Sequence, residues 1–195
     1  MPRSFTPSPV GYGSGRDRDN NWELTLAGEL TDKHSELVTQ FVEVPARSKG
    51  TLWIDSCGGS VYAGLSIASI IQLRGLRVTA VVAGECSSAA LLPLGACSER
   101  YVTPHSTLLF HPMRWQSEED VQLEQATEWA RHFKELEEGL DALLARLLDI
   151  SPELLSKWCR PGRFVSGPEC VEAGIARLLT LFDGPLQNQI ASMRT

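Results

Sequence analysis

The chain has 195 residues, of which 43% are hydrophobic and 22% are charged. This composition predicts one globular domain with a buried core and is unlike that of a disordered chain. The formal net charge is −6 and no basic run is present, which argues against nucleic acid as a partner. No apolar run reaches the ~18 residues of a membrane span, so we expect no membrane partner either.

The ends of the chain differ in composition from its middle. Residues 1–20 are rich in serine, proline, glycine and charge, and lack the charged-then-apolar pattern of a secretory signal. We therefore predict a disordered tail at 1–20, a single domain at 21–184 and a C-terminal tail at 185–195. The five cysteines form no CxxC pair or Cys/His cluster. We expect a cytoplasmic protein without a disulfide framework or a metal site.

The first half of the domain alternates between strand and helix patterns. Apolar and polar residues alternate in the first predicted strand, whereas the second is mostly apolar, as in a strand covered on both faces. This order predicts a largely parallel sheet with helices on its faces and right-handed crossovers. In chain order we expect a strand at Trp22–Leu26, a helix from Thr31 or Asp32 to about Val42, a strand at Thr51–Asp55, a helix that includes Leu65, Ala68, Ile71 and Leu73 and ends at Gly75, a strand at Arg77–Val82, a helix at Ser87–Ala96, and short strands at Arg100–Val102 and Thr107–Phe110.

A long amphipathic helix is predicted in the second half. The segment Ser117–Asp120 resembles a capping box, and apolar residues then recur at spacings of three and four from Ala126 to Leu147. About thirty helical residues span ~45 Å, so we expect this helix to project and pack on another subunit; the alternative is a helix that crosses its own sheet. The remaining predicted elements are a helix from Ser151 to Cys159, a loop at Arg160–Ser166, a helix from Pro168 to Ala173 and a strand at Ile175–Phe182.

Three features at the carboxyl ends of predicted strands together indicate acyl transfer. Gly58 and Gly59 follow one strand and could present backbone N–H groups to an oxyanion, although a plain tight turn explains them as well. Ser87 and Ser88 lie where the next strand meets a helix, whose N-terminus favours negative charge near a serine oxygen; a simple helix cap is the alternative. His111 ends a later strand, where a histidine is more often structural. Because sites in open parallel sheets lie at these strand ends, the three features can converge on one site.

The same segments resemble the ClpP family, the proteolytic subunits of Clp proteases. Ile54–Val61 is similar to that family's Asn-Ser-Pro-Gly-Gly-Ser-Val turn, and Gly84–Ala90 to the segment around its nucleophile, in a register that selects Ser88 over Ser87. Pro104–His111 follows the family's Pro-Asn-Ser to Met-Ile-His pattern, which selects His111. The resemblance runs in one order from about Trp22 to Leu179 and includes the closing segment that begins at Phe164.

The resemblance implies a ClpP/crotonase-like α/β fold with a mostly parallel β-sheet, flanking helices and a long projecting oligomerisation helix. It implies a serine endopeptidase in which Ser88 is the nucleophile, His111 is the base, and the backbone N–H groups of Gly59 and Ala89 hold the oxyanion. It further implies a homo-oligomer of stacked heptameric rings, fed with polypeptide substrates by a Clp-class ATPase. The chain has no P-loop pattern, so we expect no cofactor here, and any ATP would be used by that partner.

The sequence departs from the family where the third catalytic residue is expected. The family has aspartate shortly before a phenylalanine, whereas here Gly162 occupies that position in the run Pro161-Gly162-Arg163-Phe164. Either another carboxylate orients His111, or a backbone carbonyl or a water does, or catalysis is weak. Asp149 and Glu169, on either side of Gly162 in the sequence, are the acidic residues we consider for this role. The segment Pro112–Gln116 also lacks the family's glycine-rich, substrate-binding strand.

These departures keep other functions open. The main alternative is a catalytically impaired subunit with an assembly or regulatory role in a mixed ring, which Gly162 favours. A crotonase-type acyl-CoA enzyme would use paired backbone N–H groups without a serine nucleophile, and Ser88 with His111 argues against it. A Ser-Lys peptidase is a further possibility, but no lysine lies in a predicted strand-end turn near Ser88.

Overall fold

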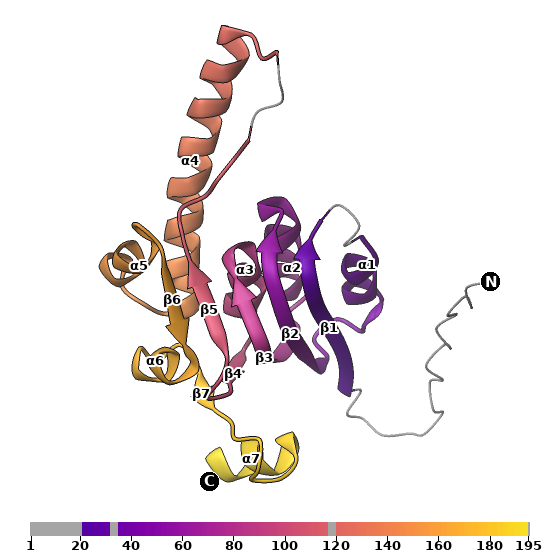
Figure 1. The fold of residues 1–195 in the computed structure, drawn as a ribbon. Helices are drawn as coiled ribbons and strands as arrows, with labels where there is room; N and C mark the ends of the chain where they lie inside the picture. Colours follow the sequence, from indigo (N-terminus) through magenta and orange to yellow (C-terminus); the bar gives the residue numbers. More distant parts are fainter. Residues whose placement is uncertain (1–20, 32–34, 117–119, 195) are drawn as a thin grey trace, which may run out of the picture.

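The computed structural model describes residues 21–31, 35–116 and 120–194; the tail predicted at 1–20 lies outside them. The protein has a mixed α/β fold with a mostly parallel sheet and flanking helices (Figure 1). Its elements are β1 (Asn21–Leu30), α1 (Ser35–Glu43), β2 (Lys49–Gly59), α2 (Val61–Leu73), β3 (Arg77–Ser87), the 3-10 turn η2 (Ser88–Ala90), α3 (Leu91–Ala96), β4 (Glu99–Val102), β5 (Thr107–Phe110), α4 (Leu123–Leu148), α5 (Pro152–Cys159), β6 (Arg163–Ser166), α6 (Gly167–Glu172), β7 (Arg177–Leu178) and α7 (Leu186–Met193).

The sheet places the ends of β2, β3 and β5 at one edge. Its strand order is β1-β2-β3-β4-β7, and β5 pairs with both β3 and β6. All these pairings are parallel except that of β5 with β6. β3 pairs with β4 early in its length and with β5 at its carboxyl end, where Ser87 lies opposite Leu109. The residues that follow β3 and β5 are therefore neighbours.

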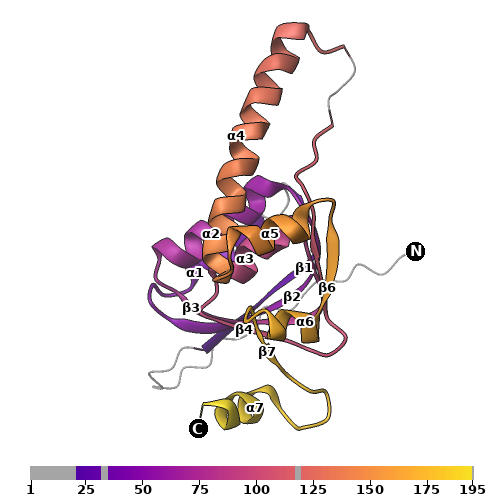
Figure 2. The ribbon, with the colours of Figure 1, turned by 90° about the vertical axis from the view of Figure 1, so that its left-hand side faces the viewer.

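The core lies between the sheet and the helices beside it. Helices α1, α2 and α3 lie on one side of the sheet, and the carboxyl end of α4 packs next to α3 (Figure 2). Ile54, Val82 and Ile67 are fully buried in this core. On α2, Ala68 and Ile71 are buried as expected, but Leu73 is 88% exposed because the helix ends there.

Helix α4 projects from the body of the protein, as predicted (Figure 1). Only Ala145 and Leu148, near its carboxyl end, are buried, while Leu123 at its start is exposed. The first part of the predicted capping box lies outside the described residues; the helix instead begins with a capping box formed by Gln122 and Gln125. None of the described helices is long and apolar enough to cross a membrane.

Two predictions near the C-terminus were wrong. The loop predicted at Arg160–Ser166 contains β6, which pairs antiparallel with β5. Pro161 and Gly162 are typical of loops, and the short strand beside them is stabilised only by its tertiary pairing. The strand predicted at Ile175–Phe182 is reduced to β7, and Phe182 is 94% exposed. Within the expected C-terminal tail the chain forms α7, which buries Ile190 against Leu179.

Candidate active site

Ser88 begins the turn that follows β3, a mostly buried strand near the middle of the sheet. Strand β3 ends at Ser87, and η2 starts at Ser88 with a φ of 56°. Positive φ is uncommon and strained for a residue other than glycine, and such residues cluster at functional sites. The sharp change of direction separates the two adjacent serines, which then face different surroundings.

Ser87 is buried and its side chain is occupied. Its Oγ donates a hydrogen bond to Glu85 Oε1 at 2.6 Å, and it makes no capping hydrogen bond to the turn that follows. Ser88, in contrast, is only partly buried and lines a pocket. Of the two serines, Ser88 is therefore the one whose hydroxyl can reach a substrate.

The glycine pair at the carboxyl end of β2 packs directly against Ser88. Gly58 has a φ of 84°, and a Cβ at this position would lie 2.7 Å from Ser88 Cβ and 3.1 Å from the backbone N of Ala89. Only glycine permits this approach. Gly59 pairs with Leu30 of β1, and a Cβ there would lie 2.3 Å from the Leu30 carbonyl oxygen. The two expected oxyanion donors, Gly59 and Ala89, thus flank the contact between Gly58 and Ser88.

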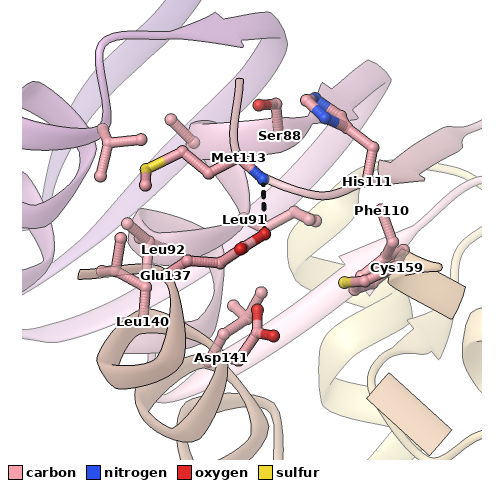
Figure 3. Close-up of a pocket in the computed structure, with 13 residues that line it drawn as sticks. Ser88, Leu91, Leu92, Phe110, His111, Met113, Glu137, Leu140, Asp141 and Cys159 are labelled. Carbon is pink, nitrogen blue, oxygen red and sulfur yellow. Dashed lines mark hydrogen bonds between the residues drawn. The ribbon is translucent and has the colours of Figure 1, made fainter. Parts of the chain in front are cut away.

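His111 follows β5 directly and lines the same pocket as Ser88 (Figure 3). Its Nδ1 lies 2.6 Å from the carbonyl oxygen of Pro112. Because a carbonyl oxygen can only accept, Nδ1 carries the proton, and Nε2 of the neutral ring is then a hydrogen-bond acceptor. In the described part of the structure, the side chains of Ser88 and His111 make no direct hydrogen bond. In enzymes, the bond between a nucleophile and its base often forms only when substrate is bound.

Position 162 lies next to His111. A Cβ there would stand 3.3 Å from His111 Cβ and 3.4 Å from the carbonyl oxygen of Phe110, and Gly162 has a φ of 131°. An acidic residue at this position would project beside the imidazole, but glycine has no side chain. The sequence left another carboxylate, a backbone carbonyl or a water as the group that orients His111. In the structure, the backbone carbonyl of Pro112 contacts Nδ1.

Asp149 and Glu169, the two carboxylates considered from the sequence, lie outside the pocket lining. Asp149 is the C-cap of α4 in a left-handed conformation. Glu169 accepts hydrogen bonds from the backbone N–H and the hydroxyl of Ser166 and forms an ion pair with Arg163. These hydrogen bonds, followed by the charge of Arg163, lower the pKa of Glu169. Neither carboxylate is among the residues that line the pocket.

Two acidic residues that no motif in the sequence singles out also line the pocket. Glu137 and Asp141, on α4, stand one helical turn apart, and Glu137 Oε1 accepts a hydrogen bond from Met113 N–H at 3.0 Å (Figure 3). The residues after His111 form no strand in this structure and instead run along α4, where the Trp115 ring stacks on Phe133 with centroids 5.4 Å apart. In the sequence, only the spacing of Glu137 and Asp141 indicates that they belong together, since residues one helical turn apart lie on the same face.

Comparison with known families agrees with this geometry. The model of a family described as Clp protease matches residues 19–179. The match extends from just before β1 to the end of β7 and includes the glycine turn, Ser88, His111 and the whole of α4.

Proposed function

The chain belongs to the Clp protease family, and on that premise we propose that it is a serine endopeptidase subunit that hydrolyses peptide bonds of unfolded polypeptides. One observation carries the proposal: Ser88, at a strained turn, and His111 line one pocket, whereas Ser87 is buried and its hydroxyl donates to Glu85. A strained turn that exposes a serine beside a histidine suits nucleophilic catalysis.

In the proposed mechanism, Ser88 Oγ attacks the carbonyl carbon of the scissile peptide while His111 Nε2 accepts the hydroxyl proton. The oxyanion is held by the backbone N–H groups of Gly59 and Ala89, each worth about 10²–10³ in rate in other serine proteases. The imidazolium returns the proton to the leaving amine. Water then attacks the acyl-enzyme by the reverse route and frees Ser88.

The Pro112 carbonyl takes the orienting role that an aspartate has in other serine proteases. Its contact with Nδ1 fixes the tautomer in which Nε2 is the base. A neutral carbonyl stabilises the imidazolium less than a carboxylate does. Altering the triad aspartate in another serine protease costs about 10⁴-fold in rate, so we expect slow turnover in this chain.

The proposed assembly is a homo-oligomer of stacked heptameric rings that receives its substrates from a Clp-class ATPase. Family members form oligomeric rings and work with Clp ATPases. In this chain, the projecting half of α4, with Leu123 78% exposed, is the surface that we expect to lie between rings. Native mass spectrometry gives the number of subunits, and a Leu123→Glu variant should lower it because a charge is costly in an apolar contact.

The test is cleavage of an unstructured polypeptide, followed by the appearance of new N-termini. We expect slow cleavage by the wild type, none by Ser88→Ala, and near wild-type cleavage by Ser87→Ala, which serves as the matched control. Cleavage that persists in Ser88→Ala would overturn the assignment of the nucleophile.

A second candidate is a catalytically impaired subunit with an assembly or regulatory role in a mixed ring. Gly162 favours it, because no side chain stands where one would contact His111. An intact oligomer of this chain that never cleaves alone, but alters the cleavage rate of an active Clp peptidase in a mixed ring, would support this candidate instead.

A further inference from the structure

The pocket beside Ser88 combines an apolar wall with two carboxylates. Val61, Leu92, Leu140 and Leu144 supply apolar side chains. Figure 3 shows Glu137 and Asp141 on α4, in the same part of the pocket as Leu92 and Leu140. Because Ser88 and His111 line the same pocket, a substrate whose carbonyl lies at Ser88 would place the adjoining side chain here.

The charges at this pocket do not balance. Arg160 Nη2 lies 2.9 Å from Asp141 Oδ2 and 3.7 Å from Glu137 Oε1, so one guanidinium faces two carboxylates. Arg160 is not among the residues that line the pocket. Cys159 also lines it, and burial, followed by the charge of Asp141, raises the pKa of its thiol to about 11, so the thiol is neutral near pH 7. Glu137 and Asp141 together with Arg160 therefore carry a net charge of −1.

Glu137 retains capacity to accept a further donor. It accepts from Met113 N–H, while its side chain remains 28% exposed. A carboxylate has about four lone-pair sites, of which these contacts use only part. A lysine or arginine side chain suits such a pocket, since its stem packs on apolar surface while its charged end meets an acceptor.

We propose that this pocket receives the substrate side chain on the acyl side of the scissile bond, and that Glu137, with Asp141, selects lysine or arginine there. The inference rests on the proposed peptidase function and adds its substrate class. The same two carboxylates repel an acidic substrate side chain. An apolar substrate side chain packs on the apolar wall but leaves the net negative charge of the pocket unneutralised.

The test uses two peptidyl diphenyl phosphonates that differ only in the residue attached to phosphorus, lysine or norleucine. Ser88 Oγ forms a bond to phosphorus, one phenoxide leaves, and the serine proton departs by way of His111 to give phenol. Norleucine keeps the apolar stem and lacks the charge. We expect the wild type to react about fivefold faster with the lysine probe, the size of a partly exposed ion pair.

The matched variants are Glu137→Gln and Glu138→Gln. Glutamine at 137 can still accept from Met113 N–H, so only the charge is lost, and the lysine preference should fall to about one. Glu138 is exposed and does not line the pocket, so Glu138→Gln should keep the wild-type preference. An unchanged preference in Glu137→Gln, or faster reaction of the wild type with norleucine, would overturn the inference.

A small fluorophosphonate without any peptide side chain separates this inference from the function on which it rests. If the fluorophosphonate labels the wild type but neither peptide probe is preferred, only the basic selectivity is wrong. If it fails to label the wild-type oligomer, the peptidase function fails and the inference fails with it.

Discussion

Gly162 lies directly against His111, since a Cβ at position 162 would stand 3.3 Å from the His111 Cβ. The position that would hold an orienting side chain is therefore in place, and the side chain is missing. The imidazole is held instead through Nδ1 by the Pro112 carbonyl. This relationship predicts that catalysis is limited by the missing charge rather than by a misplaced histidine.

The first prediction is a gain of function in Gly162→Asp. A carboxylate beside His111 stabilises the imidazolium, so the rate at which a fluorophosphonate labels Ser88 should rise at least tenfold. Because Gly162 has a φ of 131°, any other residue strains the backbone by about 1–3 kcal/mol. Gly162→Asn carries the same strain without the charge and is the control; an equal gain in both variants would contradict the account.

A second prediction concerns the contact between Gly58 and Ser88. In Gly58→Ala the new Cβ would lie 2.4 Å from the Ser87 carbonyl oxygen and 2.7 Å from Ser88 Cβ. The turn must then shift, and cleavage and labelling at Ser88 should both be lost. Circular dichroism should still report a folded chain, because the clash is local to the turn.

The matched glycine variant is Gly139→Ala in α4, which we expect to be stabilising. A Cβ at this position meets nothing within 4 Å, and alanine in a helix interior is favoured over glycine by about 0.5–1 kcal/mol. The midpoint of thermal unfolding should rise slightly while the labelling rate stays unchanged. A fall in the midpoint would show that α4 is not a regular helix at this position.

A third prediction follows from the lowered pKa of Glu169 in the capping box of α6. A carboxyl whose pKa is lower in the folded state adds stability above its unfolded pKa, and that contribution is lost as pH falls through the folded value. Wild type should therefore exceed Glu169→Gln in unfolding midpoint near pH 7, and the difference should shrink in acid. A difference that grows as pH falls would have the wrong sign.

A fourth prediction tests the packing beneath His111. Phe110 precedes it and is fully buried against Trp158, with ring centroids 5.0 Å apart. Trp158→Ala should lower the free energy of unfolding by about 3–5 kcal/mol, measured by denaturant titration. Cleavage should fall as well, since β5 carries His111; a stable variant with full cleavage would show that this pair does not support the site.

The convergence of Ser88 and His111 follows from local patterns in the sequence. Each ends a strand of a predicted parallel sheet, and β3 and β5 are neighbours, with Ser87 opposite Leu109. Strand and helix periodicity were enough to predict this edge of the sheet. The choice of Ser88 over Ser87 as the candidate nucleophile came only from the family resemblance. In the structure, the Ser87 hydroxyl is already used in a hydrogen bond to Glu85.

Other parts of the site depend on tertiary packing that periodicity does not encode. Glu137 and Asp141 enter the pocket because of the rotation of α4 about its axis as it docks beside α3. The contact between His111 and the Pro112 carbonyl depends on the backbone path of a segment without regular structure. Strand β6 was missed because four residues beside Pro161 and Gly162 form a strand only by pairing with β5.

The most direct test of the central claim is intact mass after treatment with a fluorophosphonate, for wild type, Ser88→Ala and His111→Ala. We predict one adduct on the wild type, located at Ser88 by peptide fragmentation, none on Ser88→Ala, and labelling at least a hundredfold slower on His111→Ala. An intact wild-type oligomer that takes up no label, or a His111→Ala variant that labels as fast as wild type, would contradict this claim.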